Sequence, residues 1–297
     1  MPPNTITIIT SPYHVGLRDH RVGNGPHRIL SQNLIPNLTS KGLKVAVHEI
    51  APVDDFEGEI GRSFEIIRRT ATAVQKAVSE NTFPVILSGN CMATVGATCG
   101  LQSHTPDPAF VYFDAHDDLD SPDVNENGYF DAMGLSMLRG ESWKSLMGTV
   151  PGYTKPVDYR RFLYVGLRDQ SEIQRRRVLE AGMRSVWGDA GKKVDFAAEL
   201  RERLGERNYR RSVVHLDLDC LDESYGKVNS YPSPGGLFEE DLVACMRLVG
   251  EAEPLSLTVC SFDPDAGDGD RIAGIGVRAI TSFVGSLLER GVLAKES

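Results

Sequence analysis

The sequence predicts an α/β protein with three layers (α/β/α), in which helices cover both faces of one mostly parallel sheet of about eight strands. Short apolar runs rich in Val, Ile and Phe recur along the whole chain. Segments with apolar residues three or four positions apart, the spacing of an amphipathic helix, lie between these runs. Continuous apolar strands that alternate with helices are typical of a parallel sheet buried on both faces.

The expected strands share this apolar character, and several of them end in polar residues. In chain order they are Thr5–Thr10, Lys44–Ile50, Phe83–Ser88, Ala109–Asp114, Arg161–Leu167, Met183–Trp187, Ser212–Asp217 and Leu255–Phe262.

The clearest helix is expected at Glu59–Ser79, where Phe64 and Ile67 belong to a continuous apolar face. Similar spacing predicts helices at Glu240–Val249 and Val277–Leu288. The sequence contains no internal repeat and no long linker rich in Pro, Gly or Ser. We therefore expect residues 1–297 to form a single domain.

Composition excludes several classes of function. The formal net charge is −9, and no Lys/Arg-rich run of the kind found in nucleic-acid-binding proteins occurs. No run approaches the ~18 apolar residues of a membrane span, and the first residues lack the pattern of a signal peptide. We expect a cytoplasmic protein with a small-molecule substrate and no nucleic-acid or membrane partner.

The chain has five cysteines, an odd number at irregular spacing, and no CxxC pair. This pattern indicates reduced thiols rather than a disulfide framework. Four of them are expected to be packed as small apolar residues. They are Cys99, Cys220, Cys245 and Cys260.

Two of the expected strands end in closely spaced metal-binding residue types. Asp114 and His116 follow one strand, and Asp217 and Asp219 follow another. Residues two apart in an extended strand point the same way, so each pair can face one site. Carboxylates crowded at such a site repel one another unless a cation supplies the opposite charge. The two motifs together predict a metal site at the carboxyl edge of the sheet.

These motifs resemble those of the arginase/agmatinase ureohydrolases. The family's DAHxD motif reads Asp114–Asp118, and its DxDxxDP motif reads Asp217–Asp222 followed by Glu223 in place of proline. Two supporting elements, GLRD and a Pro-Gly-Gly turn, occur at Gly166–Asp169 and Pro234–Gly236. The order of all these elements along the chain also matches the family, which implies an arginase-like fold.

The resemblance implies two metal ions, Mn²⁺ in the first place, in one centre. By this resemblance Asp114 and Asp217 bridge the ions, Asp118 completes the shell of one ion, and His116 with Asp219 completes the other. A water held between the ions would be the nucleophile, since two cations lower its pKa and polarise the group that it attacks. Oxygen ligands with imidazole suit manganese. Family members often assemble as homo-oligomers.

The first departure from the family pattern is Cys91, which replaces a metal-binding histidine in Ser88–Met92. One interpretation makes its thiolate a metal ligand, since nearby cations lower the pKa of a thiol. The other makes Cys91 a packed thiol beside a weakened metal site. A thiolate ligand adds negative charge and favours softer metals, so divalent ions other than Mn²⁺ are also compatible.

The second departure concerns the family's proton-carrying histidine, whose place is taken by Asp131. Asp131 could carry protons only with a raised pKa, and it could equally be a solvated or helix-capping residue. Asp131 and Asp118 are our candidate catalytic side chains.

The third departure affects substrate binding. Ser261 occupies the place of the family's guanidinium-binding glutamate, and a hydroxyl cannot form the same charged pair. Asp263 lies close enough in sequence to replace that carboxylate. Asp120, Asn127 and Tyr129 take the polar positions of the loop that holds the amino-acid end of the substrate in arginases.

These departures remove groups that serve a strongly basic guanidinium. N-hydroxyguanidines are less basic, and the pattern also resembles the N-hydroxyarginine amidinohydrolases of cycloserine biosynthesis. We therefore expect a metal-dependent C–N hydrolase whose best substrate is N-hydroxy-L-arginine, giving hydroxyurea and ornithine. The alternatives are an agmatinase-like or other guanidino-acid hydrolase, and a metal-binding homologue without catalysis.

Overall fold

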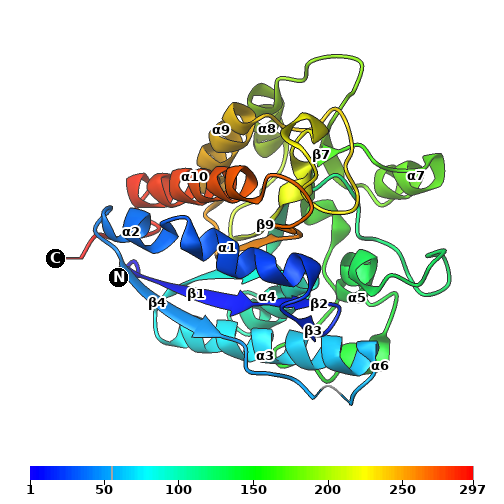
Figure 1. Cartoon of the computed structure of the whole chain (residues 1–297), viewed down its shortest axis with the longest axis horizontal. Coiled ribbons are helices and arrows are strands. Elements are labelled where there is room, and N and C mark those ends of the chain that lie inside the picture. The colour runs from blue at the N-terminus through cyan, green and yellow to red at the C-terminus, as the bar shows by residue number, and fades with distance from the viewer. Residues whose placement is uncertain (55, 297) are drawn as a thin grey trace.

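The computed structural model describes residues 1–54 and 56–296, so that Asp55 and Ser297 lie outside the described residues. Within them all eight expected strands form one parallel sheet, as predicted (Figure 1). From edge to edge the strands are β4 (Lys44–Glu49), β1 (Thr5–Ser11), β5 (Phe83–Ser88), β10 (Ser256–Cys260), β9 (Ser212–Asp217), β6 (Ala109–Phe113), β7 (Phe162–Leu167) and β8 (Arg184–Trp187). A short antiparallel pair, β2 (Tyr13–His14) and β3 (Leu17–Arg18), follows β1.

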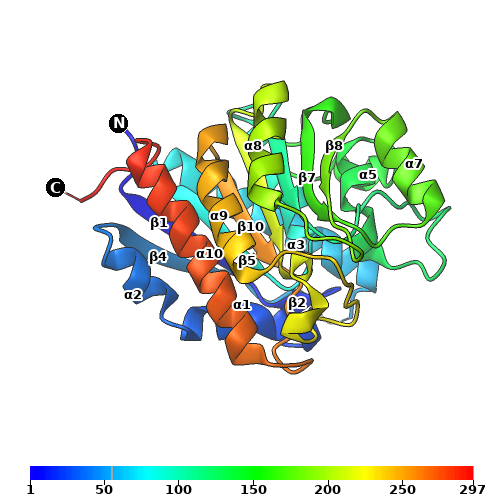
Figure 2. The same ribbon diagram turned by 90° about the horizontal axis from the view of Figure 1, so that it is seen from above.

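Helices cover both faces of the sheet and make the three layers (Figure 2). One face packs against α1 (Gly25–Ser31), α2 (Leu34–Thr39), α8 (Phe196–Glu206), α9 (Glu239–Val249) and α10 (Gly269–Glu289). The other packs against α3 (Glu59–Ser79), α4 (Ala93–Gln102), α5 (Gly134–Leu138), α6 (Lys144–Met147) and α7 (Glu172–Glu180). Each face has its own apolar core, which explains why the strands are apolar on both sides.

Helix α10 is longer than the apolar pattern of the sequence indicated. It begins at Gly269 rather than Val277, and Asp268 caps it by accepting a hydrogen bond from the Arg271 backbone N–H. By length and hydropathy alone α10 could cross a membrane, but 61% of its apolar window is buried inside the protein. Such burial is the pattern of a core helix.

The four central strands bring the chemically informative residues together. β5, β10, β9 and β6 are neighbours, so the segments that follow them meet at one edge of the sheet. Cys260 of β10 lies directly beside Asp217 of β9 in the parallel register. In open parallel sheets the carboxyl edge of the strands is the usual position of a ligand site.

Candidate metal centre

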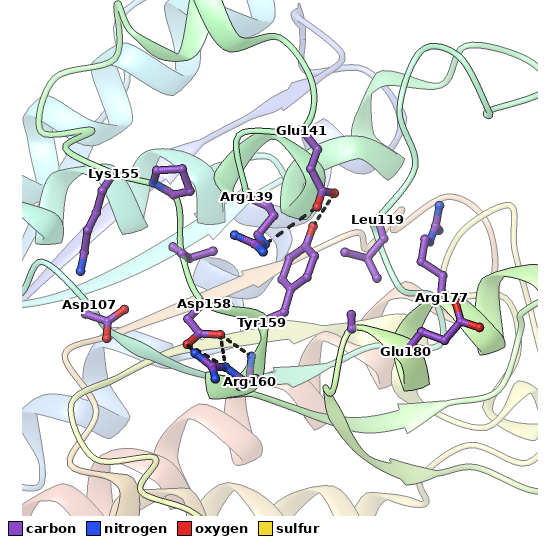
Figure 3. A pocket seen from close by; sticks show the side chains of 13 residues that line it. Asp107, Leu119, Arg139, Glu141, Lys155, Asp158, Tyr159, Arg160, Arg177 and Glu180 are labelled. Carbon is purple, nitrogen blue, oxygen red and sulfur yellow. Dashed lines mark hydrogen bonds and ion pairs between the residues drawn. The ribbon is translucent and has the colours of Figure 1, made fainter.

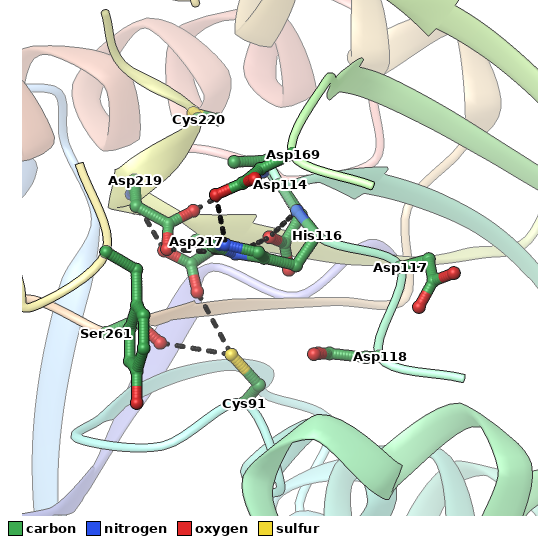
Figure 4. A network of polar contacts seen from close by, with 12 residues as sticks. Cys91, Asp114, His116, Asp117, Asp118, Asp169, Asp217, Asp219, Cys220 and Ser261 are labelled. Carbon is green, nitrogen blue, oxygen red and sulfur yellow. Dashed lines mark hydrogen bonds and ion pairs between the residues drawn. The ribbon is translucent and has the colours of Figure 1, made fainter. Parts of the chain in front are cut away.

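Two pairs of residues meet at the carboxyl ends of β6 and β9 (Figure 4). His116 Nδ1 lies 3.4 Å from Asp114 Oδ1 and 3.3 Å from Asp219 Oδ2. Asp217 orients the loop after β9, because its Oδ1 accepts a hydrogen bond of 2.7 Å from the Asp219 backbone N–H. The structure thus brings together Asp114, His116, Asp217 and Asp219, as the sequence predicted. All three aspartates are buried.

Asp118 also belongs to this group, whereas its neighbour Asp117 does not (Figure 4). Asp118 has a left-handed backbone (φ 52°), a conformation that residues other than glycine adopt less often. Its Oδ2 accepts a hydrogen bond of 2.6 Å from the Tyr112 hydroxyl. Asp117 instead forms an ion pair with Arg177 at 2.9 Å. The two neighbouring aspartates thus have different surroundings, and only Asp118 has a ligand atom within reach of the other cluster residues.

The side chain of Cys91 points into the cluster. Its Sγ lies 3.0 Å from Asp217 Oδ2 and 3.0 Å from the Ser261 hydroxyl (Figure 4). Ser261, like Asp118, has a left-handed backbone (φ 60°). The thiol is buried, but among polar groups. This orientation supports the interpretation in which Cys91 faces a metal rather than the apolar core.

Two further buried residues, His215 and Cys260, lie beneath the cluster, and our sequence analysis did not place them there. His215 Nε2 lies 3.5 Å from Cys260 Sγ and 3.7 Å from Asp114 Oδ2. Cys260 Sγ lies 3.6 Å from Cys91 Sγ. His215 could have been found from strand periodicity, because it lies two residues before Asp217 and shares its face of β9. Cys260 has no such signal in the sequence.

His116 and neighbouring hydrogen bonds hold the pKa of Asp219 below its ordinary value, but the charges of the other carboxylates are poorly compensated by the protein. Burial and the charge of Asp219 raise the pKa of Asp114 to about 7. Burial and the same neighbour raise the pKa of Asp217 well above its ordinary value, and burial raises that of Asp118 similarly. Among the described residues, Asp114 Oδ2 is buried without a hydrogen-bond partner. Each of these features indicates that a cation would stabilise the cluster.

The donor set fits divalent metal ions. Three overlapping groups have ligand atoms that all lie within 4.8 Å of one another. They are Asp114, His116 and Asp219; Cys91, Asp114, Asp118 and His215; and Cys91, His215, Asp217 and Cys260. Carboxylate, imidazole and thiolate are the ligand types that divalent metals use in proteins.

Asp131 is tied to the loop that carries Cys91. Its Oδ1 accepts a hydrogen bond of 2.9 Å from the Met92 backbone N–H, and its Oδ2 accepts one of 3.2 Å from the Cys91 N–H. Asn90 Nδ2 donates a third, at 2.5 Å. Burial raises the pKa of Asp131 to about 6. Asp131 is thus a buried acceptor for the loop before α4 rather than a solvated residue, while a role in proton transfer stays a prediction.

A cavity of about 220 Å³ opens onto the cluster. All the residues that we expected to bind substrate line it, namely Asp120, Asn127, Tyr129, Ser261 and Asp263. Residues that sequence reasoning missed also line it, among them His14, Arg21 and Tyr231. The cavity is smaller than the ~300 Å³ lower bound that is usual for drug-sized ligands, so it suits a small molecule.

The expected substrate residues are held in different ways. Asp120 is fixed, since its carboxylate accepts hydrogen bonds from Arg177 at 2.9 Å and from Asn125 at 2.8 Å. Asn127 is exposed and accepts a hydrogen bond from the Tyr129 backbone N–H at 3.0 Å. The Tyr129 ring lies 6.1 Å from that of Tyr231, between centroids. These residues form a polar and aromatic rim around the cavity.

Residues of the supporting motifs hold the cluster from behind. Asp169 Oδ2 lies 3.4 Å from His116 Nε2, the ring nitrogen opposite the one that faces the aspartates. Arg168 donates hydrogen bonds to the carbonyl oxygens of Asp219 (2.8 Å) and Leu221 (2.9 Å). Asn229 Nδ2 donates to Asp219 Oδ2 at 2.9 Å. Such contacts fix the orientation of metal ligands.

The last aspartate of the second motif has a structural role. Asp222 Oδ2 accepts hydrogen bonds from the backbone N–H groups of Gly235 (2.7 Å) and Gly236 (3.2 Å). Gly235 has a positive φ of 83°, a conformation that glycine adopts without strain. The Pro-Gly-Gly turn is thereby fixed to the loop after β9.

A larger cavity, of about 630 Å³, lies between the segment before β7 and helix α7 (Figure 3). Its charged groups are largely paired with one another. Asp158 binds Arg160 at 2.7 Å, and the Tyr159 hydroxyl donates to Glu141 at 3.1 Å. None of its described lining residues belongs to the metal-ligating groups, so we place the functional site at the smaller cavity.

Comparison with known proteins agrees with this geometry. The arginase family model matches residues 4–285. The chain is 24% identical to an arginase of Bacillus subtilis over 256 residues, which cover 84% of this chain and 86% of the relative. It is also 24% identical to an arginase of Staphylococcus aureus over 298 residues, which cover 95% and 98% of the two chains.

Solved structures share the fold. An arginase of Bacillus caldovelox superposes with a TM-score of 0.85 at 21% identity, covering 96% of this chain and 99% of the other. Proclavaminate amidino hydrolase of Streptomyces clavuligerus superposes with a TM-score of 0.73 at 18% identity, covering 96% and 92%. From the extent of the family match and the site at the carboxyl edge of its sheet, we conclude that the chain belongs to the arginase family.

Proposed function

We propose that the protein is a dinuclear metal hydrolase that cleaves a C–N bond of a small guanidino or N-hydroxyguanidino compound. The proposed specific reaction is the hydrolysis of N-hydroxy-L-arginine to hydroxyurea and ornithine. In this reaction water adds to the guanidino carbon, the bond from that carbon to the side-chain nitrogen of ornithine breaks, and the departing nitrogen takes up a proton. The relatives that act as arginases and as an amidino hydrolase support the reaction class.

The residues that would hold the two ions are those of the cluster. By the family resemblance Asp114 and Asp217 would contribute to both ions, and His116 with Asp219 would hold one of them. Cys91 and Asp118 lie toward the other ion. When bound, two divalent ions, Mn²⁺ or others, would lower the pKa of a water between them and polarise the substrate amidine.

The observation that carries the choice of substrate is the environment of Ser261. Its hydroxyl lies against the Cys91 thiol, 3.0 Å away, so it is engaged with the cluster and offers no negative charge to a substrate. A guanidinium remains protonated at neutral pH, and burying it without an anionic partner is costly. An N-hydroxyguanidine is a weaker base and can bind in its neutral form. The site therefore favours the less basic substrate.

Asp131 bears on how the departing nitrogen obtains its proton. Its carboxylate already accepts hydrogen bonds from Asn90, Cys91 and Met92, so reorienting it toward a departing amine would break contacts that hold the Cys91 loop. A poor leaving group needs a proton from a positioned acid. The departing group is ornithine for N-hydroxy-L-arginine and for L-arginine alike, so this requirement applies equally to both substrates.

The lining of the cavity also offers a cation that could bind a carboxylate. Arg21 is the one arginine or lysine among the described lining residues, and it hydrogen-bonds the Ser230 hydroxyl. His14, beside it, stays neutral because burial lowers its pKa to about 4. An amino acid could place its carboxylate at Arg21 and its reactive group at the metal cluster. This arrangement supports an amino-acid substrate rather than a decarboxylated amine.

The test is a comparison of kcat/KM for N-hydroxy-L-arginine and L-arginine with the same metal-loaded protein. We expect N-hydroxy-L-arginine to be hydrolysed more efficiently, with hydroxyurea and ornithine as products. The Asp217→Asn variant gives the background from other enzymes in the preparation. A clear preference for L-arginine would show that another group, with Asp263 the nearest candidate, replaces the missing carboxylate.

A further inference from the structure

We infer that His215 and Cys260 belong to the metal centre, and that with Cys91 and Asp217 they form a tetrahedral zinc site beside a harder site formed by Asp114, His116 and Asp219. The inference rests on the proposed dinuclear centre and names the ligands and the metal of one of its sides. Asp118, whose carboxylate accepts a hydrogen bond from Tyr112, is then not one of the four zinc ligands, and the water of the proposed reaction would be a fifth ligand. Neither His215 nor Cys260 belongs to the motifs from which the metal centre was predicted.

The distances between the ligand atoms match a tetrahedral zinc site. With Zn–S bonds of about 2.3 Å and Zn–N bonds of about 2.0 Å, the ligand atoms of a tetrahedron stand about 3.5–3.8 Å apart. The Sγ atoms of Cys91 and Cys260 are 3.6 Å apart, and Cys260 Sγ is 3.5 Å from His215 Nε2. Both distances from Cys260 Sγ thus match the required spacing, and the ligand atoms of all four residues lie within 4.8 Å of one another. Asp217 Oδ2 lies closer, 3.0 Å from Cys91 Sγ, because the Cys91 thiol donates a hydrogen bond to it. A bound metal would replace the proton of this hydrogen bond.

His215 is oriented as a metal ligand. Its Nδ1 lies 2.7 Å from the Thr94 hydroxyl, which can accept a hydrogen bond from Nδ1–H and so leave Nε2 free to bind a metal. Its ring stacks on Tyr112, with centroids 3.8 Å apart and planes 6° apart. Both contacts fix the ring so that Nε2 faces Cys260 and Asp114. A hydrogen bond at the second nitrogen is the usual arrangement for a histidine that binds a metal.

The fold supports this site from rigid elements. Cys91 lies between β5 and α4, Cys260 ends β10, and His215 and Asp217 lie on β9. These strands are the centre of the sheet, and the four side chains are buried. Asp114 Oδ2, buried without a hydrogen-bond partner in the described protein, points to the same space at 3.7 Å from His215 Nε2. A cation there would satisfy it.

The chemistry of the donors selects the metal. Two thiolates, one imidazole and one carboxylate form a soft, tetrahedral set, which favours Zn²⁺ over Mn²⁺. The set formed by Asp114, His116 and Asp219 has oxygen and nitrogen donors and suits Mn²⁺ better. Each thiol loses its proton to the solvent as its bond to zinc forms, so that zinc binding releases protons.

The decisive experiment is X-ray absorption at the zinc edge of the full-length protein loaded with one equivalent of Zn²⁺ under a phosphine reductant. We expect two sulfur neighbours at about 2.3 Å. One sulfur neighbour would exclude Cys260, and none would exclude the whole site. A Cys91–Cys260 disulfide in the freshly purified protein would also overturn the inference.

Variants extend the test without relying on activity. Cys260→Ala and His215→Ala should each bind zinc at least tenfold more weakly, and Cys260→Ala should reduce the sulfur neighbours from two to one. Cys99→Ala is the matched control, because Cys99 is equally buried but lies within α4, outside the metal-ligating groups of the described residues. Zinc binding unchanged in Cys260→Ala would contradict the proposal. Two sulfur neighbours without hydrolysis would overturn the proposed function alone.

Discussion

The two sides of the cluster differ in their chemistry and in how the sequence encodes them. On one side, Asp114, His116 and Asp219 form an oxygen-rich group that is partly open, since the His116 side chain keeps 30% of its surface exposed. On the other side Cys91, Cys260 and His215 are buried and bring sulfur and nitrogen together. The difference suggests that one centre can distinguish two metals by the hardness of its ligands.

The two sides share Asp217, so its substitution should have the largest effect. Asp217→Asn should lose both ions and lower activity at least ~100-fold, because even the outer contacts of metal ligands are worth ~10–100-fold. Metal content can be measured by mass spectrometry after gel filtration. Glu223→Gln is the matched control, since Glu223 is exposed and close in sequence. Retention of both ions by Asp217→Asn would refute the shared centre.

Substitutions of Cys91 should change metal binding on its own side of the cluster, which includes Cys260 and His215, and leave the other side unchanged. Cys91→Ala should lose one ion and keep the other, whereas Cys91→His should keep two and shift the preference of the altered side from zinc toward manganese. Competition between Zn²⁺ and Mn²⁺, with each metal counted, measures this shift. If both variants keep the wild-type metal content, Cys91 is only a packed thiol.

Asp131 should affect the side of the cluster formed by Cys91, Cys260 and His215, because its carboxylate holds the loop that carries Cys91. Asp131→Ala leaves the donors of Asn90, Cys91 and Met92 without their acceptor, which should lower the free energy of unfolding by ~3 kcal/mol. The zinc affinity should fall more than the manganese affinity. Urea unfolding measures the first effect, with the exposed Asp123→Ala as control. An unchanged free energy of unfolding would show that these hydrogen bonds contribute little.

The smallest effect is expected at Asp169, behind the oxygen-rich side. Asp169→Asn removes a charged acceptor 3.4 Å from His116 Nε2 and should weaken manganese binding by ~10-fold while zinc binding stays the same. Titration of each metal separately makes the comparison, and the exposed Asp189→Asn is the control. Equal weakening of both metals would argue against two distinct sides.

The sequence predicted the sheet and one side of the cluster well, for a physical reason. The strands are buried on both faces, so their apolar runs stand out, and Asp114, His116, Asp217 and Asp219 lie within short motifs. Asp118 was included by its motif, although its left-handed backbone became visible only in the structure.

The other side could not be derived from local spacing. Cys260 meets Cys91 only because β10 lies between β5 and β9, an order that is not evident from the chain. Arg21 likewise reaches the cavity from the segment after β3. The early start of α10 was missed because its first turns depend on the cap at Asp268 rather than on an apolar stripe.

The central claim is that the chain holds two metal ions at this edge of the sheet. Native mass spectrometry of the metal-free protein, titrated with Zn²⁺ and Mn²⁺ together, tests it most directly. We predict a species with two ions per chain, one of each metal, that disappears in Asp217→Asn. Saturation at one ion, or at none, would contradict the account.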